Sequence, residues 1–93
     1  MEKALPRIVC AAMRCVDIVV VGPRHYDSVM QQQIAFYESL WTKNKVEQGF
    51  IDQHGNFYNR HDAWVIAEAN GQIYRRCGGD TIDGGRLFSE NLY

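Results

Sequence analysis

Residues 49–71, with the sequence GFIDQHGNFYNRHDAWVIAEANG, decide the fold of this chain. Two β-prone runs at 49–51 and 56–58 flank a glycine-containing turn at 52–55, which predicts an antiparallel hairpin. The apolar spacing then becomes helical, with Ala63, Ile66 and Ala67 on one face. The stretch therefore predicts two strands followed directly by a helix.

The residues at the two ends of this helix define its boundaries. Asn59 is suited to cap the first turn, and Asp62 completes a weak capping box three residues later. Asn70 and Gly71 supply the chemistry that ends helices. We therefore expect the helix to run from about residue 60 to 69.

The chain before this unit predicts a second hairpin and a longer helix. Residues 7–13 and 18–21 form two β-prone runs around 15–17, and Gly22-Pro23 stops the second run. Between residues 26 and 41 the apolar side chains recur with helical spacing, and Asp27 is suited to cap the start. The apolar face consists of Met30, Ile34, Tyr37 and Trp41, widened by Val29, Phe36 and Leu40.

The chain after residue 71 is less regular. Ile73-Tyr74 predicts a further short strand, and the glycine-containing segments 78–80 and 83–85 predict turns. Together these patterns predict a single α+β domain over residues 1–93, with a small antiparallel sheet of about four strands and two main helices.

Composition excludes several classes of protein. With 93 residues, 46% of them hydrophobic, the chain can build one core but not two domains. The net charge is −1 and no run of like charge is longer than Arg75-Arg76. Because general DNA binding requires clustered phosphate contacts, no DNA partner is expected.

Three cysteines, Cys10, Cys15 and Cys77, match neither a disulfide framework nor a zinc site. We interpret them as inert thiols in a reducing compartment. The apolar stretch 8–21 is interrupted by Arg14 and Asp17, so it is too short and too charged for a membrane span. These features predict a cytoplasmic protein without membrane association.

Candidate anion-binding residues stand where the two predicted helices begin. Arg24-His25 precedes the first helix and Arg60-His61 opens the second, although cations are unfavourable at the positive end of a helix dipole. An anionic ligand reverses this penalty, because free N–H groups and guanidinium groups then both donate to phosphate oxygens. The alternative is that each arginine pairs with a nearby acid, Asp27 or Asp62.

Aromatic residues beside polar or basic neighbours are candidates for stacking on a base. Stacking contributes about 1–3 kcal/mol per base. The alternative is ordinary packing of aromatic side chains in a half-buried sheet. The four candidates are Phe50, Phe57, Tyr58 and Tyr74.

Catalytic motifs are incomplete in this sequence. His61-Asp62 resembles the metal dyad of helical phosphohydrolases but lacks the further His and Asp partners. Residues 80–84 lack the alternating oxygen ligands of a calcium loop. Neither a phosphate-binding loop nor a nucleophile motif occurs. We therefore expect no enzyme activity, no catalytic residue, no metal site and no cofactor.

Several short motifs, in this order and spacing, resemble one family. They are Gly22-x-Arg24-His25 before a helix; Gly49-Phe50 with Phe57, Arg60 and Ala63; Ala67 with Gly71-Gln72; and Leu87-x-Ser89-Glu90-Asn91-Leu92. This pattern is similar to the first type of phage anti-Thoeris sponge protein, which sequesters cyclic ADP-ribose signals. The chain departs from the family pattern at Pro23, and at Asn91, where an acid is expected.

The resemblance implies a phage protein that holds glycocyclic ADP-ribose isomers, without cleaving them, at a pocket between subunits of a homo-oligomer, a dimer or a hexamer. Some relatives also take up cyclic di- or trinucleotides at separate sites. Arg24 and Arg60 would contact phosphate or ribose, and Phe50 or Phe57 would stack on adenine. The further ligand-binding candidates are His25, Arg75, Arg76, Ser89, Glu90 and Asn91.

Other functions stay open at this point. The same arginines and aromatics suit a nucleic-acid-binding phage regulator, and the apolar first helix suits a regulator that docks on a host protein. A small enzyme that degrades a nucleotide messenger would use His25 or His61 as acid or base. Residues 90–93 also resemble part of a protease-recognition tag.

Overall fold

A computed structural model describes residues 5–81 and 84–93. It contains a four-stranded antiparallel sheet in the order β2-β1-β3-β4. The strands are β1 (Ile8–Cys15), β2 (Ile18–Gly22), β3 (Val46–Asp52) and β4 (Phe57–Asn59); the helices are α1 (Ser28–Ala35), α2 (Glu38–Lys43), α3 (Arg60–Ala69) and α4 (Ser89–Leu92). The predicted α+β class is confirmed.

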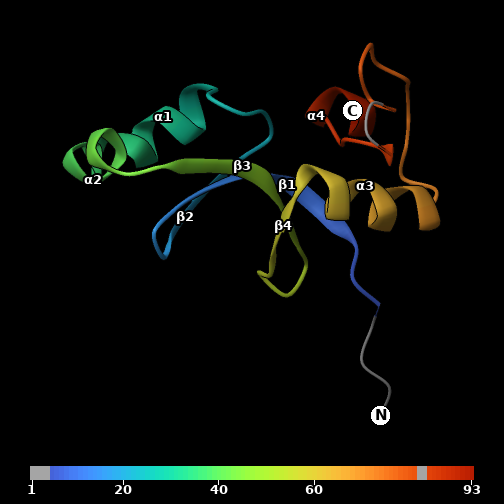
Figure 1. Ribbon diagram of the computed structural model, residues 1–93, viewed down its shortest axis with the longest axis horizontal. Helices are drawn as coiled ribbons and strands as arrows, with labels where there is room; N and C mark the ends of the chain where they lie inside the picture. Colours follow the sequence, from blue (N-terminus) through green and yellow to red (C-terminus); the bar gives the residue numbers. More distant parts are fainter. Residues whose placement is uncertain (1–4, 82–83) are drawn as a thin grey trace.

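The helices are divided between the two ends of the sheet. In Figure 1, α1 and α2 lie together at one end, and α3 and α4 lie at the other. The loop that leaves β2 and the C-terminal residues approach each other between these two groups. This arrangement brings the start of the first helix near the end of the chain.

The core forms where alternate side chains of the strands meet the helices. Its members are fully or almost fully buried, and they come from three strands, two helices and the segment before α4. They are Ile8, Ala11, Met13, Val20, Met30, Phe50, Ala63, Trp64, Ala67 and Leu87. Leu87 therefore anchors the C-terminal residues to the same core as the sheet.

Both predicted hairpins and both predicted helix caps are confirmed. The Asp27 side chain accepts a hydrogen bond from the Met30 amide, and the Asn59 side chain accepts one from the Asp62 amide. The second helix has the predicted bounds, because α3 runs from Arg60 to Ala69.

The prediction of one helix over residues 26–41 is wrong. The backbone N–H of Phe36 donates to the Gln33 carbonyl, and that of Tyr37 donates to the Ile34 carbonyl. Hydrogen bonds of this three-residue spacing tighten and end a helix. The apolar face is thus divided between α1 and α2, and Phe36, at the break, is 86% exposed.

The prediction of a strand at Ile73-Tyr74 is also wrong. The backbone N–H groups of Tyr74 and Arg75 both donate to the carbonyl of Asn91, at 2.6 and 3.2 Å, instead of pairing with a strand. Helix α4, which supplies that carbonyl, was not predicted. The predicted turn at 83–85 includes Asp83, which lies outside the described residues.

Candidate anion-binding site

Arg24 and His25 lie in the loop between β2 and α1. The carboxylate of Asp27 accepts hydrogen bonds from the backbone N–H groups of Arg24 and Met30, at 3.0 and 2.9 Å. Across residues 5–81 and 84–93, the ion pairs are Arg14–Glu47 and Arg76–Asp80. The Arg24 guanidinium therefore does not pair with Asp27. The alternative that this arginine forms an ion pair with its neighbouring acid is not observed.

His25 is fixed against the sheet. Its Nε2 lies 2.9 Å from the carbonyl oxygen of Gly49, and its ring meets the ring of Phe50 edge-on at 5.2 Å. Burial lowers the pKa of His25 below its ordinary value, and the charge of Arg60 lowers it further, although the Gly49 carbonyl acts in the opposite direction. His25 is thus a half-buried ring within the electrostatic range of Arg60.

Arg60 begins α3 and points toward the C-terminal residues. Its guanidinium donates to the carbonyl of Leu87 at 2.7 Å and to the side chain of Gln48 at 2.5 Å. The guanidinium also lies 4.9 Å from the centre of the Phe88 ring. Burial lowers the pKa of Arg60, and the charge of Glu90 partly opposes that effect.

The C-terminal segment, Leu87–Tyr93, connects the two arginines. Arg24 donates to the backbone oxygen of Tyr93, and its guanidinium lies 5.0 Å from the centre of the Tyr93 ring. The Tyr93 hydroxyl donates to the carbonyl of Pro23 at 2.7 Å. Arg24 and Arg60, which are distant in sequence, therefore each contact an aromatic residue of one short segment.

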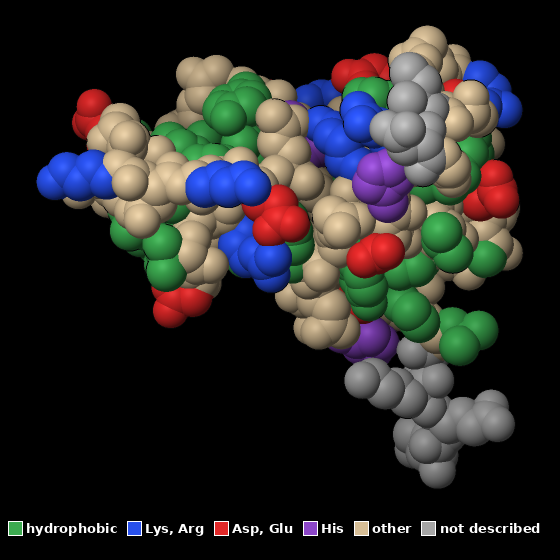
Figure 2. All heavy atoms as spheres, in the orientation of Figure 1, with side chains coloured by type: hydrophobic (Ala, Val, Ile, Leu, Met, Phe, Trp, Pro, Cys, Tyr) green, Lys and Arg blue, Asp and Glu red, His purple; other side chains and the backbone are tan. Residues whose placement is uncertain are grey.

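Glu90 lies among these basic groups. Its side chain is exposed, and its charge raises the pKa of both His25 and Arg60, which places the carboxylate near both. Arg86 adds a further positive charge close to Arg60. Figure 2 shows basic side chains gathered beside a histidine over the start of α3. The site combines several cationic groups with one carboxylate.

One nitrogen of Arg24 has no acceptor. Its Nη1 atom is buried and has no hydrogen-bond partner within the described part of the chain. A buried donor without a partner loses its hydration and gains nothing in return, a cost of about 1–3 kcal/mol that is larger for charged groups. An anion at this atom would remove that cost.

Phe50 does not join the site as a stacking surface. Its ring is fully buried in the core, so no face is free for a base, which corrects the expectation for this residue. The Phe57 ring lies on the face of the sheet toward which Gly49 points, because a Cβ added to Gly49 would meet the ring at 2.6 Å. The guanidinium of Arg14 lies 4.5 Å from the centre of this ring. Because Gly49 and Phe50 point to opposite faces of the sheet, Phe57 and His25 are on opposite faces.

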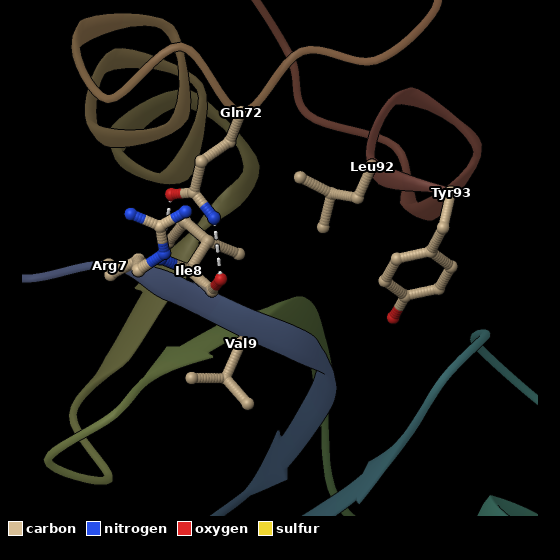
Figure 3. A pocket seen from close by; sticks show the side chains of 6 residues that line it. All are labelled: Arg7, Ile8, Val9, Gln72, Leu92 and Tyr93. Carbon is tan, nitrogen blue, oxygen red and sulfur yellow. Dashed lines mark hydrogen bonds between the residues drawn. The ribbon is translucent and has the colours of Figure 1, made fainter.

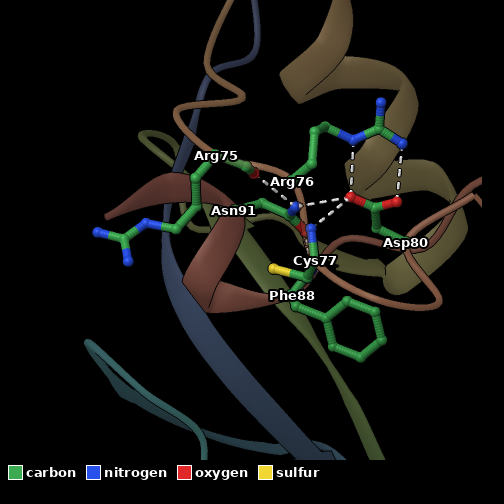
Figure 4. Close-up of polar contacts among 6 residues, drawn as sticks. All are labelled: Arg75, Arg76, Cys77, Asp80, Phe88 and Asn91. Atoms are coloured by element: carbon green, nitrogen blue, oxygen red, sulfur yellow. Dashed lines mark hydrogen bonds and ion pairs between the residues drawn. The ribbon is translucent and has the colours of Figure 1, made fainter.

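The remaining candidates hold the C-terminal residues in place (Figure 4). Arg76 pairs with Asp80 through two contacts of 2.8 Å, and its guanidinium lies over Trp64. Asn91 is fully buried and donates to the Arg75 carbonyl and to Asp80. Ser89 is buried at the start of α4, while Arg75 is exposed beside Tyr74.

A cavity of about 210 Å³ adjoins the site (Figure 3). The side chain of Gln72 forms two hydrogen bonds with the backbone of Ile8 on one side of it, and Leu92 and Tyr93 lie on the other. Two larger cavities, of about 370 and 390 Å³, lie at the β1–β2 end of the sheet and beside α1. Ligand pockets usually measure about 300–1,000 Å³, so the adjoining cavity alone is too small for a dinucleotide.

Tyr93, Phe88 and Gln48 were missed in the sequence. Each contacts one of the two arginines, and no periodic pattern marks any of them. Phe88 and Tyr93 are aromatic residues among polar residues near the end of the sequence. This was the one signal that could have found them, because arginine commonly stacks on aromatic rings.

Two further observations concern the described residues as a whole. No group of three or more His, Cys, Asp or Glu side chains among them is arranged to hold a metal ion. None of their helices has the length and apolar character that crossing a membrane requires.

Comparison with known proteins supplies the family. No curated protein and no solved structure matches the chain. Residues 7–93 match the model of the family described as phage T4 y16D protein. The match includes residues 90–93, so these residues fit the family pattern as well as that of a tag. Because it covers nearly the whole sequence, the chain belongs to the phage T4 y16D protein family.

Proposed function

We propose that this phage protein binds cyclic nucleotide signals of the ADP-ribose type, which carry phosphate groups, and that it sequesters these signals without cleaving them. The observation that carries the proposal is the convergence of Arg24 and Arg60 on the segment Leu87–Tyr93. Neither guanidinium forms an ion pair in the described part of the chain. Arginines with no Asp or Glu side chain within ion-pair distance are suited to bind phosphate groups.

The charges near the arginines also support a nucleotide in preference to a simple anion. Glu90 is exposed and close to His25 and Arg60. A carboxylate repels phosphate but accepts hydrogen bonds from hydroxyl groups. A ligand that carries both ribose hydroxyls and phosphates would satisfy Glu90 and the arginines together.

Sequestration without cleavage is consistent with the surroundings of His25. Its Nε2 is directed at the Gly49 carbonyl, and burial together with Arg60 lowers its pKa. A histidine held in this way positions the loop instead of exchanging protons with a ligand. The proposal therefore assigns His25 a binding or positioning role.

A homo-oligomer is part of the proposal. The cavity beside Tyr93 measures about 210 Å³, which is less than a nucleotide of this class requires. A second copy of the chain could supply the missing wall, since short chains commonly build closed pockets at subunit interfaces. Cyclic di- and trinucleotides are further candidate ligands of such an assembly.

The test is a calorimetric and thermal-shift screen of the purified protein with ADP-ribose, its glycocyclic isomers, and cyclic di- and trinucleotides. We expect one class to raise Tm strongly and to be recovered intact after denaturation of the complex. Recovery of a cleaved product would replace the proposal with an enzyme. The absence of any shift would exclude nucleotide sequestration.

A second candidate function is docking on a host protein. Exposed apolar side chains gather on and beside α1, where Tyr26 is 47% exposed, Val29 48%, Phe36 86% and Tyr37 40%. Such a surface is typical of protein interaction sites. Phe36→Ser would abolish a host-protein interaction of this kind but would leave nucleotide binding unchanged, so the two functions are separable by one variant.

A further inference from the structure

We infer that the buried edge of Arg24 is a phosphate subsite and that Tyr93 closes it, so that a bound nucleotide enters and leaves only when the Tyr93 contact opens. This inference rests on the proposed function. It assigns to Tyr93 control over the exchange of ligand.

Arg24 has one free donor in the described part of the chain. A guanidinium carries N–H donors along its edges in a fixed planar geometry. One terminal nitrogen, Nη2, donates to the backbone oxygen of Tyr93, whereas the other, Nη1, is buried without an acceptor. Phosphate oxygens match the geometry of such an edge. The same nitrogen that lacks a partner is therefore suited to hold a phosphate oxygen.

Tyr93 lies against this guanidinium. Tyr93 contacts the loop in three ways: its ring faces the Arg24 guanidinium at 5.0 Å, its backbone oxygen accepts from Arg24, and its hydroxyl donates to the Pro23 carbonyl at 2.7 Å. Nη1 is buried while these contacts are present, and we assign its covering to Tyr93, so that a ligand reaches the nitrogen only after Tyr93 moves.

Tyr93 can move without the rest of its segment. Asn91 is fully buried and bonded to Arg75 and Asp80, and Leu87 is held by the core and by Arg60. By contrast, Tyr93 is 39% exposed, and its contacts with the Pro23–Arg24 loop lie at the surface. Opening therefore requires the loss of the Tyr93 contacts only.

The charges around the subsite favour a phosphate. Arg24, Arg60 and Arg86 contribute positive charge near the segment, and Glu90 is the nearby acid that affects both Arg60 and His25. Asp27 is also close to Tyr93, but its carboxylate accepts the backbone N–H groups of Arg24 and Met30. Around the C-terminal segment as a whole, the three arginines therefore outnumber the two carboxylates, Glu90 and Asp27.

The experiment measures binding kinetics by surface plasmon resonance, with the glycocyclic ADP-ribose isomers, ADP-ribose and inorganic pyrophosphate as probes. For Tyr93→Ala we expect the association and dissociation rate constants to rise together by about tenfold. The reason is that no Tyr93 side chain has to move away before the ligand enters or leaves. Tyr93→Phe keeps the ring but loses the bond to Pro23, so a smaller rise in both is expected. Tyr37→Ala, at a matching exposure of 40%, is the control without effect.

The phosphate contact is tested separately with Arg24→Gln. We expect its affinity for the bound nucleotide and for pyrophosphate to fall by about tenfold or more. Lys43→Gln removes an equal charge at the end of α2 and should leave both affinities unchanged. Melting curves of every variant establish that each is folded.

The outcomes distinguish this inference from the proposed function. If a nucleotide binds and Arg24→Gln leaves its affinity unchanged, the phosphate subsite is overturned while sequestration stands. If both Tyr93 variants keep the association rate of the wild-type protein, closure by Tyr93 is overturned. If the wild-type protein binds none of the probes, the proposed function and the inference fail together.

Discussion

The hydroxyl of Tyr58 donates to the carboxylate of Asp52 at 2.7 Å, across the turn that joins β3 to β4. The same carboxylate accepts the backbone N–H groups of His54 and Asn56, at 2.8 and 2.9 Å, and the Asn56 side chain at 3.1 Å. Asp52 is only 2% exposed. A single buried carboxylate thus organises the hairpin that leads into α3 and positions Arg60.

Asp52→Asn should destabilise the protein by about 1–3 kcal/mol, because an amide replaces one acceptor oxygen with a donor that faces other donors. The measurement is urea unfolding at pH 7. Asp17→Asn, at the exposed turn between β1 and β2, loses the same charge and serves as the control. Equal unfolding midpoints for the two variants would show that the Asp52 network contributes no stability.

The stability of the protein should fall in acid because of Asp52 and Asp80. Hydrogen bonds from Tyr58 and Asn56 outweigh burial and hold the pKa of Asp52 well below its usual range, and Arg76 does the same for Asp80. A carboxyl group whose pKa is lowered in the folded state stabilises the folded state at pH values above its unfolded-state pKa of about 4. This contribution is lost as the pH falls from there toward the folded-state pKa. Urea midpoints measured from pH 7 to pH 3 should decrease below about pH 5, with a smaller decrease in Asp52→Asn.

His25 should produce a separate dependence at higher pH. Its pKa is lowered in the folded protein, mainly by burial, so between that value and about 6.5 the unfolded chain binds the additional proton. The stability that neutral His25 contributes is therefore fully present above about pH 6.5, and it decreases as pH falls toward the folded-state pKa of His25. NMR titration of the three histidines should show a pKa for His25 below the ordinary value of about 6.5, and added pyrophosphate should raise this pKa. A pKa for His25 above that value in the free protein would contradict the burial seen here.

The parts of the fold that were predicted depend on local chemistry. Asn59 and Asp27 cap helices through side chains three residues from the N–H groups they bind, so the sequence alone reveals them. Arg24 and Arg60 were recognised because cations at helix starts are unfavourable without a partner.

The parts that were not predicted depend on contacts between distant residues. Tyr74 and Arg75 bind the Asn91 carbonyl, and this non-local partner replaces the strand that their composition suggested. Helix α4 has only four residues, too few for a periodic signal, and it is held by the buried amide of Asn91. For Phe50 the sequence left stacking and core packing both open, because the strand pattern does not reveal which face the core covers, and the buried ring follows the second alternative. The contact of Tyr93 with Arg24 joins residues that are 69 positions apart, so no local sequence pattern reveals it.

Gly49→Ala should destabilise the protein by about 3 kcal/mol or more, because the added Cβ has no space. It would lie 2.1 Å from the Tyr58 carbonyl oxygen and 2.6 Å from the Phe57 ring. Since the closest atom belongs to the backbone, β4 would have to move away from β3. Gly78→Ala, where no atom lies within 4 Å, should change stability by less than about 0.5 kcal/mol. Thermal unfolding of both variants checks the difference, and a Gly49→Ala variant as stable as Gly78→Ala would mean that the hairpin relaxes freely.

Asn91→Asp should destabilise the C-terminal segment although the two side chains have almost the same shape. The amide nitrogen of Asn91 donates to the Arg75 carbonyl at 2.9 Å and to the Asp80 carboxylate at 3.1 Å. A carboxylate there would lose both donations and would place a second negative charge beside Asp80 in a buried position. We expect a loss of about 2–4 kcal/mol in urea unfolding at pH 7.

The pH dependence of that loss identifies its cause. Protonation of one of the two carboxyls restores a donor and removes the repulsion, so the difference between Asn91→Asp and the wild-type protein should narrow as the pH is lowered from 7 to 4. Asn44→Asp adds the same charge at an exposed position, and its smaller difference should not narrow in this way. A loss in Asn91→Asp that is constant with pH would indicate the missing hydrogen bonds of the amide instead of charge repulsion. In that case an acid at position 91, as in the sponge pattern, would be disfavoured by the missing amide donor and not by the charge of Asp80.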